Sequence, residues 1–182
     1  GTWSSANNSI ANVNNGGIIN TSGAGTVVLT YIRNSDGCQS TKSFEVYSNP
    51  LTPVIGVITQ PTCIIPTGSV ELSGLPPIGT WTVTSSPLGY TYVGTGTEYT
   101  VSLLDTSTTF TFTVTDQNQC ISSVSANVVI QAIPTDPVLS GDSLICVGSD
   151  AAFFPSNNGN WVSLNPSVAS ITTNGVATAI TS

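Results

Sequence analysis

Four cysteines are the residues of this 182-residue chain whose type and spacing most clearly predict chemistry. Cys63 and Cys120 lie far apart in the sequence with Trp81 between them, and none of the four forms the Cys-x-x-Cys pair that is typical of metal sites. In a chain with few charges, this usage indicates disulfide bonds and an oxidising compartment. We predict a Cys63–Cys120 disulfide, which could stabilise the fold by about 4 kcal/mol by closing a long loop. Two free thiols are the alternative.

The other polar residues do not form a recognisable catalytic or metal-binding set. The chain has no histidine, so its serines lack the commonest general base, and its nine acidic residues show neither Asp-x-Asp nor calcium-loop spacing. The glycine-rich stretches 23–25 and 94–96 lack the strand-to-helix context of a phosphate loop. The sequence therefore predicts no enzyme, no catalytic residue, no cofactor and no metal site. Calcium shared between Asp136 and a neighbouring loop is kept as an alternative.

The composition limits the classes of partner. Charged residues make up only 6% of the chain, against roughly 25% in ordinary soluble domains. Arg33 and Lys42 are the only cations and the net charge is −7, which argues against nucleic acid and anionic membranes as partners. No apolar run approaches the roughly 18 residues that span a bilayer, so we expect no membrane insertion. Because the sequence starts at Gly1 in mid-pattern with no signal peptide, we expect a piece of a longer chain, and the cysteine usage described above indicates that this chain is exported.

The stretch Thr108–Asp116 sets the fold class. Phe110, Phe112 and Val114 alternate with threonines, so an extended chain would place them on one dry face. Six further short segments have strand character and are separated by proline, glycine and asparagine turns. The seven predicted strands are 54–59, 69–74, 80–84, 90–94, 97–103, 109–115 and 121–131. This spacing predicts an all-β, immunoglobulin-like sandwich, with a barrel as the lesser alternative.

Three Gly-x-Trp motifs indicate an internal repeat. Their tryptophans are Trp3, Trp81 and Trp161, which are almost evenly spaced along the chain. The first and third motifs continue in parallel, from positions 3–13 to positions 161–171, and Gly17 matches Gly175 at the same offset. So many matches at one offset are hard to obtain by chance, so we interpret the chain as tandem copies of one unit.

The repeat divides the chain into one whole unit and two partial ones. We predict a complete immunoglobulin-like repeat at 49–133, the C-terminal part of a preceding repeat at 1–48, and the N-terminal part of a following repeat at 134–182. The joints around 48–53 and 133–137 carry prolines, which stiffen the backbone. The sequence therefore predicts tandem sandwiches in an extended, semi-rigid rod.

Cys38 and Cys146 occupy the repeat positions of Cys120 and Cys63, because about one repeat unit separates the two members of each pair. Each lies in a partial repeat, so we predict two half-disulfides whose partners lie outside this segment, upstream of Cys38 and downstream of Cys146. The alternative is a Cys38–Cys146 bond between neighbouring chains of a head-to-tail assembly.

The three tryptophans are predicted core residues. A tryptophan at one fixed place in each repeat is typical of a plug beneath the sheets, so we assign Trp3, Trp81 and Trp161 to the cores of their units. The alternative is a platform for stacking sugars. Tyr90, Tyr92 and Tyr99 are better candidates for exposed contacts, although they could also pack across strands.

Several stretches resemble a known family of surface proteins. The patterns Gly-Thr-Trp-Ser-Ser with Ser-Ile-Ala, Gln-Pro-Thr-Cys with Pro-Thr-Gly-Ser-Val, and Phe-Thr-Val-Thr-Asp-Gln-Asn-Gln-Cys are similar to the repeats of giant gliding adhesins of the Bacteroidetes, of the SprB type. Residues 165–176 also resemble bacterial immunoglobulin-like domains. The resemblance covers essentially the whole chain. Similar repeats also occur in many other surface proteins of that phylum.

This resemblance implies export by the type IX system, display on the cell surface through an outer-membrane anchor outside this segment, and attachment to a substratum during gliding motility. It also implies O-glycosylation of Asp-Ser/Thr-apolar triplets, which Asp142-Ser143-Leu144 fits at Ser143.

From these observations we expect a structural repeat of a long extracellular adhesin filament. Its partners would be neighbouring repeats of the same chain, with like chains in a filament and a surface polysaccharide or substratum as further candidates. One alternative is a carbohydrate-binding sandwich module of a secreted protein. Another is a fibre subunit joined by strand complementation, although the duplicated Gly-x-Trp segments would then supply the same strands twice.

Overall fold

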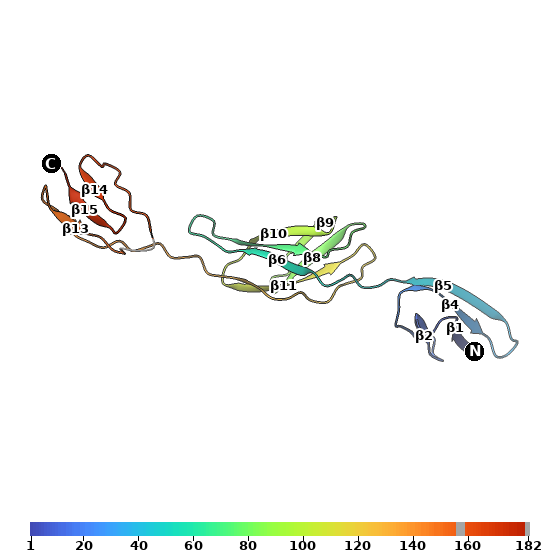
Figure 1. Cartoon of the computed structure of the whole chain (residues 1–182). Helices are drawn as coiled ribbons and strands as arrows, with labels where there is room; N and C mark the ends of the chain where they lie inside the picture. Colours follow the sequence, from blue (N-terminus) through green and yellow to red (C-terminus); the bar gives the residue numbers. More distant parts are fainter. Residues whose placement is uncertain (156–158, 181–182) are drawn as a thin grey trace. The chain divides into compact units, whose positions relative to one another are not determined.

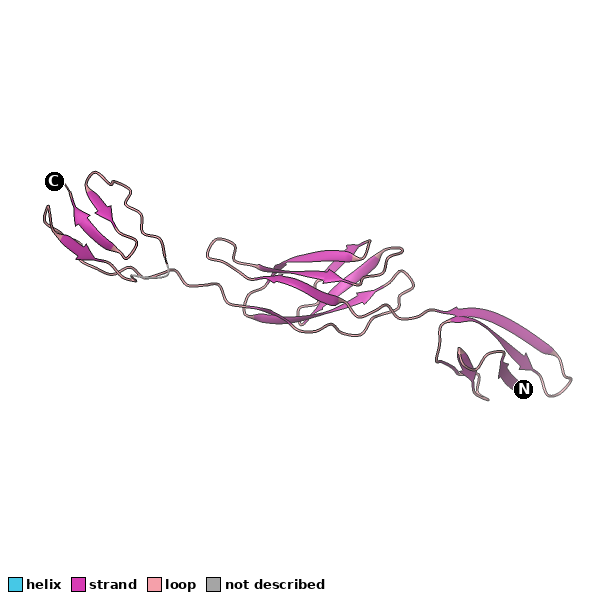
Figure 2. Ribbon diagram, viewed as in Figure 1, coloured by secondary structure: helices cyan, strands magenta, loops and turns pink. Residues whose placement is uncertain are grey.

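The computed structural model describes residues 1–155 and 159–180, and every regular element in them is a β-strand (Figures 1 and 2). The described residues therefore contain no helix that is long and apolar enough to cross a membrane. The chain divides into two compact units, Gly1–Ile133 and Pro134–Ser182. The further division of the first unit at residues 48 and 49 stays a prediction.

The part of the first unit that follows residue 53 is a two-sheet sandwich (Figure 2). One sheet has the order β10-β7-β6 and the other has the order β12-β11-β8-β9. The strands are β6 (Val54–Thr59), β7 (Gly68–Ser73), β8 (Trp81–Ser86), β9 (Thr91–Gly94), β10 (Glu98–Leu104), β11 (Thr108–Thr115) and β12 (Val128–Ile130). Seven antiparallel strands with a buried tryptophan opening β8 define an immunoglobulin-like sandwich, which confirms the predicted fold class.

The alternating residues of β11 form the centre of the core. Phe110, Phe112 and Val114 are each no more than 1% exposed, while the threonines between them are only half-buried. Residues of both sheets pack against them in one cluster, which also contains Leu72, Trp81, Val83, Val101 and Ile130. Each large apolar side chain buried in this way stabilises the fold by about 1.5–3 kcal/mol. Since β11 also pairs with β8 and β12, it stabilises both its sheet and the core.

The segment after β11 is the one place where the predicted strands are wrong. A strand is predicted at 121–131, but the regular strand β12 covers only Val128–Ile130. Ser122 and Ser125 donate their backbone N–H groups to the carbonyls of Val114 and Phe112, and their hydroxyls accept the N–H groups of the same two residues at 3.0 and 2.9 Å. Ser122 and Ser125 are three positions apart, but their partners Val114 and Phe112 are two positions apart. The extra residue makes this segment a bulge rather than a regular ladder.

Residues 1–48 form a smaller arrangement of five strands. A three-stranded sheet has the order β1-β4-β5, and a separate hairpin joins β2 to β3. The bounds are β1 (Thr2–Ser5), β2 (Ala11–Val13), β3 (Ile19–Thr21), β4 (Gly25–Ile32) and β5 (Gln39–Val46). Ala11, Val27 and Leu29 are buried, whereas all three residues of β3 are exposed.

The second unit contains one three-stranded sheet, β13-β15-β14. Its strands are β13 (Asp150–Ala152), β14 (Ala169–Ile171) and β15 (Val176–Ala179). The small side chains of Ala151, Ala177 and Ala179 are buried in it, and an isolated bridge pairs Ser140 with Phe154.

The hairpins β2–β3 and β14–β15 have the same structure, at the same offset that carries Trp3 onto Trp161. Val13 pairs with Ile19 as Ile171 pairs with Ala177, and the other pairs of the two ladders correspond in the same way. The turn before β2 also recurs, because the Ser9 hydroxyl donates to Asn7 at 2.6 Å and the equivalent Ser167 hydroxyl donates to Asn165 at 2.7 Å. The internal repeat is therefore a repeat of structure as well as of sequence.

Candidate functional site

The four cysteines lie in turns or loops rather than in strands. Cys38 lies in the turn between β4 and β5, Cys63 in the loop between β6 and β7, and Cys120 in the turn that follows β11. Asp116 shapes the last of these turns, because its Oδ1 accepts the N–H groups of Asn118 and Cys120, each at 2.9 Å. No disulfide joins cysteines of the described residues.

The structure argues against the predicted Cys63–Cys120 disulfide, because the two residues lie at opposite ends of the sandwich. Gln60, at the start of the Cys63 loop, bonds to the backbone of Val129, which pairs with Thr109 at the beginning of β11. The Cys120 turn lies beyond the other end of β11, and the extended chain from Thr109 to Asp116 spans about 23 Å. A disulfide requires Cα atoms within about 7 Å of each other.

The difference comes from the positions of the cysteines relative to β7 and β11. Both strands begin at the same end of the sandwich, where Gly68 packs against Ile130 and Ile130 pairs with Thr108. Cys63 precedes β7, whereas Cys120 follows β11. A residue before one strand and a residue after the other are thus separated by the length of the domain. The order Cys-Trp-Cys is immunoglobulin-like, but the strand positions are not.

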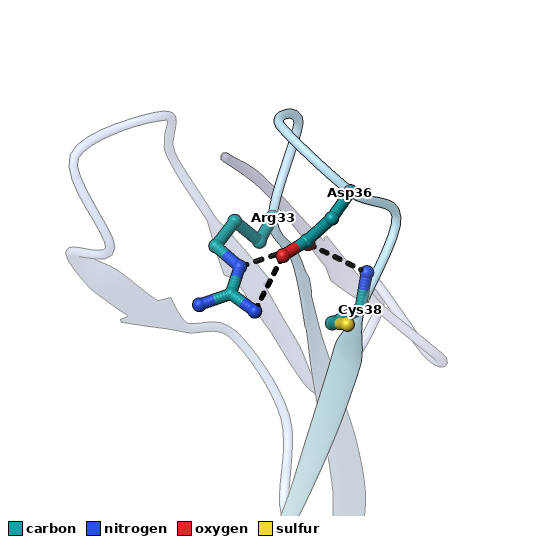
Figure 3. Close-up of polar contacts among 3 residues, drawn as sticks. All are labelled: Arg33, Asp36 and Cys38. Carbon is teal, nitrogen blue, oxygen red and sulfur yellow. Dashed lines mark hydrogen bonds and ion pairs between the residues drawn. The ribbon is translucent and has the colours of Figure 1, made fainter.

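Arg33, Asp36 and Cys38 form a polar cluster at the tip of the β4–β5 hairpin (Figure 3). The Arg33 guanidinium donates to both carboxylate oxygens of Asp36, at 2.8 and 2.6 Å, and the same carboxylate accepts the Cys38 N–H at 3.1 Å. The guanidinium lowers the pKa of Asp36, and the carboxylate raises the pKa of Arg33. The pair is exposed to solvent and caps a turn. The positive charge of Arg33 is already neutralised by Asp36.

The structure buries Trp81 but leaves the other two tryptophans half-buried. Trp81 is 1% exposed, donates its Nε1–H to the Gly96 carbonyl at 2.8 Å, and packs edge-to-face on Tyr99 at 5.4 Å between ring centroids. This indole is therefore closed to any ligand in the sandwich. Trp3 packs against Tyr31, with ring centroids 4.8 Å apart, and Trp161 packs against Phe153, with centroids 6.0 Å apart.

The candidate contact tyrosines do not form an exposed row. Tyr92 and Tyr99 pack against the core with ring centroids 6.1 Å apart, and both are partly buried. Tyr90 is 41% exposed, and its hydroxyl donates to the Asp105 carboxylate at 2.8 Å. This hydrogen bond raises the pKa of Tyr90. One exposed ring tied to a carboxylate is a poor platform for a sugar.

A shallow hollow lies on the outer face of the β10-β7-β6 sheet. It measures about 300 Å³ and lies over Gly56 and the strands that carry Glu71 and Glu98. Glu71 pairs with Thr100 and Glu98 with Ser73, so the two carboxylates lie diagonally on one face. No group of three metal-ligating side chains and no unpaired buried side-chain nitrogen or oxygen occurs among the described residues.

Asp142, Ser143 and Leu144 are exposed in the segment before β13, and Leu144 is 89% exposed. An enzyme that modifies Ser143 would therefore meet an accessible hydroxyl. Asp136 also lies in an exposed segment of the same unit.

Comparisons with known proteins add little to this picture. No family model matches the chain, and no curated protein matches it. Among solved structures, domains 4 and 5 of the S-layer protein SbsC align with 74% of this chain and 70% of that one, at 17% identity and a TM-score of 0.28. SbsC domains 1–6 align with 99% of this chain and 24% of that one, at 17% identity and a TM-score of 0.29. The FN1–FN3 domains of chicken CNTN1 align with 79% of this chain and 55% of that one, at 12% identity and a TM-score of 0.25. Likenesses this low carry no argument about function.

Proposed function

We propose that this chain is a structural repeat segment of a long extracellular adhesin filament, whose domains hold a distal binding tip away from the cell. The observation that carries the proposal is the recurrence of one hairpin, with the same register, as β2–β3 and as β14–β15. A spacer can be built by repeating one fold, and its length is set by the number of copies.

The chemistry of the domain is consistent with a purely mechanical role. Its core is sealed around Trp81 and the phenylalanines of β11, and its polar clusters are turns and caps. Low charge and abundant threonine suit a chain that works outside the cell, where strand ladders resist tension through many backbone hydrogen bonds.

The finer elements of the proposal rest on the sequence. Residues 49–133 would be one domain of the filament, with 1–48 and 134–182 as parts of its neighbours. The partners would be adjacent repeats, like chains in a bundle, and a polysaccharide or substratum at the tip. Gliding motility, type IX secretion, outer-membrane anchoring and a glycan on Ser143 follow from the family resemblance. An intact mass of native protein without added hexose would remove the glycan.

Pulling single molecules with an atomic force microscope tests the mechanical role. The domain at 49–133 should unfold in one force peak that releases roughly 300 Å of contour length, less the folded length of the domain. Extension without any force peak would contradict the proposal. Saturable binding on a glycan array that Tyr90→Ala abolishes would instead support a carbohydrate-binding module.

A further inference from the structure

The side chain of Gln60 joins the first strand of the sandwich to its last strand. Gln60 directly follows β6, and its carboxamide donates an Nε2–H to the Val129 carbonyl at 2.9 Å. Through Oε1, the same carboxamide accepts the Gln131 N–H, also at 2.9 Å. Because β6 and β12 belong to different sheets, these two hydrogen bonds cross from one sheet of the sandwich to the other.

The two bonds have the pattern of a parallel β-ladder. In such a ladder, a residue donates to the carbonyl that precedes its partner and accepts from the N–H that follows its partner. The Gln60 carboxamide makes both bonds around Ile130. It therefore acts as one rung of a parallel pairing along the edge of β12, whose other edge is paired with β11.

β6 and β12 run in the same direction along the domain. β6 is antiparallel to β7, and β12 is antiparallel to β11. β7 and β11 begin at the same end of the sandwich, where Gly68 packs against Ile130, the partner of Thr108. The chain therefore enters the sandwich through β6 at one end and leaves it after β12 at the other end.

A pull on the two sides of the sandwich would load β6 and β12 in opposite directions along their lengths. The two strands would have to slide past each other, so the bonds between them would have to break together. β12 is short and pairs with β11 at only three positions. Gln131 directly follows β12, so the Gln60 bonds lie at the place where the load leaves the sandwich.

The loop that follows the half-buried Gln60 is closed by its own hydrogen bonds. Pro61 is buried, and its ring fixes the φ angle of the next residue in the chain. Thr62 N–H donates to the Ile65 carbonyl at 2.8 Å, and the Thr62 hydroxyl accepts the Ile65 N–H at 2.9 Å. A side chain on such a fixed backbone loses less conformational entropy when it makes its bonds.

We propose that Gln60 is a mechanical clamp, which ties the first strand of the sandwich to the last and sets its resistance to tension along the chain. The proposal deepens the filament function and rests on it, because a clamp of this kind matters in a chain under load. Gln60 acts on the backbone of β12, so the side chains of Val129 and Gln131 are not part of the clamp.

Constant-force measurements on the full chain, held at its two ends, test this role. Gln60→Glu keeps the shape of the side chain, but its carboxylate has no hydrogen to donate to the Val129 carbonyl. At one force, this variant should unfold the sandwich about tenfold faster than the wild type. Gln131→Ala is the matched control, because it removes an exposed side chain and keeps the backbone N–H, and its lifetime should not change.

Protonation of the new carboxyl group provides a check on the same variant. At about pH 3, below the ordinary glutamate pKa of about 4.3, the carboxyl group of Gln60→Glu carries a hydrogen that it can donate. The difference in lifetime between this variant and the wild type at the same pH should then become smaller. A difference that stays the same at both pH values would contradict a lost donor as its cause.

A second variant separates the clamp from ordinary stabilisation. Val83→Ala leaves a cavity in the core, but β8 pairs only with β9 and β11, so neither end of the chain pulls on it directly. It should lower the urea midpoint of the sandwich more than Gln60→Glu does. Under force it should nevertheless accelerate unfolding less than Gln60→Glu does.

The outcomes distinguish the clamp from the filament function. Equal lifetimes of Gln60→Glu and the wild type under force would overturn the clamp and leave the filament function standing. Acceleration that follows the urea midpoints alike in Gln60→Glu and Val83→Ala would also overturn the clamp, since Gln60 would then be an ordinary stabilising residue. A wild-type chain that extends without resistance would overturn the clamp and the filament function together.

Discussion

Gly94 packs against the indole ring of Trp81, so closely that a Cβ atom on Gly94 would come within 2.5 Å of the ring. The two residues pair across β8 and β9, where Trp81 opens one strand and Gly94 closes the other. Only glycine leaves room for a tryptophan at this position, and that room allows the indole Nε1–H to reach the carbonyl of Gly96, in the loop between β9 and β10.

Truncation of Trp81 should therefore make the sandwich less stable. Trp81→Ala should lower the free energy of unfolding by about 3–5 kcal/mol, because it leaves a large cavity. Gly94→Ala should cost about 1–3 kcal/mol through overpacking. Urea denaturation of the full chain measures both, with the exposed neighbour Thr95→Ala as a control that should stay within about 0.5 kcal/mol. Wild-type stability in Trp81→Ala would show that the indole is not a core residue.

The serines after β11 should be important for stability despite their small size. Ser125→Ala removes the hydroxyl that accepts the buried N–H of Phe112, and leaving that group unpaired should cost about 1–3 kcal/mol. Ser123→Ala, at an exposed position two residues earlier, is the matched control and should be nearly neutral. Thermal unfolding of the two variants checks this, and equal melting temperatures would contradict the bulge.

The positions of the cysteines predict the outcome of disulfide mapping. Proteolysis under non-reducing conditions should yield no peptide that links Cys63 to Cys120, because the two lie at opposite ends of the sandwich. Cys120→Ser should accordingly leave the melting temperature of the sandwich unchanged under oxidising conditions. Recovery of the linked peptide would mean that the fold brings the two ends of β11 together, which the strand register forbids.

The hydrogen bond from Tyr90 to Asp105 should be visible in the titration of the tyrosine. The carboxylate favours the neutral phenol, so the pKa of Tyr90 is raised in the folded state and the bond stabilises the fold below the ordinary pKa of about 10. That contribution is lost as the pH rises through the folded pKa. Asp105→Asn should lower the pKa of Tyr90 toward its ordinary value, as measured by NMR of the ring carbons. An unchanged titration would show that the bond does not form.

The strand pattern could be predicted from the sequence where side chains alternate strictly. Phe110, Phe112 and Val114 alternate with threonine, and the structure buries all three. The repeat could also be predicted, because Gly17 matches Gly175 at the offset that carries Trp3 onto Trp161. In the structure these glycines have similar positive φ angles, 81° and 77°, and lie beside the equivalent tryptophans. Local pattern was sufficient for these features because each is decided by neighbouring residues.

Features that depend on contacts across the fold could not be predicted. The bulge at Ser122 and Ser125 arises because hydroxyl groups replace backbone acceptors of β11, and serine is equally common in regular loops. The prediction of a Cys63–Cys120 disulfide rests on spacing, but spacing does not tell which end of a strand a cysteine occupies.

Gold labelling of intact, unpermeabilised cells with antibodies against residues 49–133 tests the central claim most directly. A repeat of an extracellular filament should label in rows that extend from the cell surface, and treatment of the cells with an external protease should remove both the label and attachment to glass. Label that appears only after permeabilisation, or attachment that survives complete removal of the label, would contradict the account.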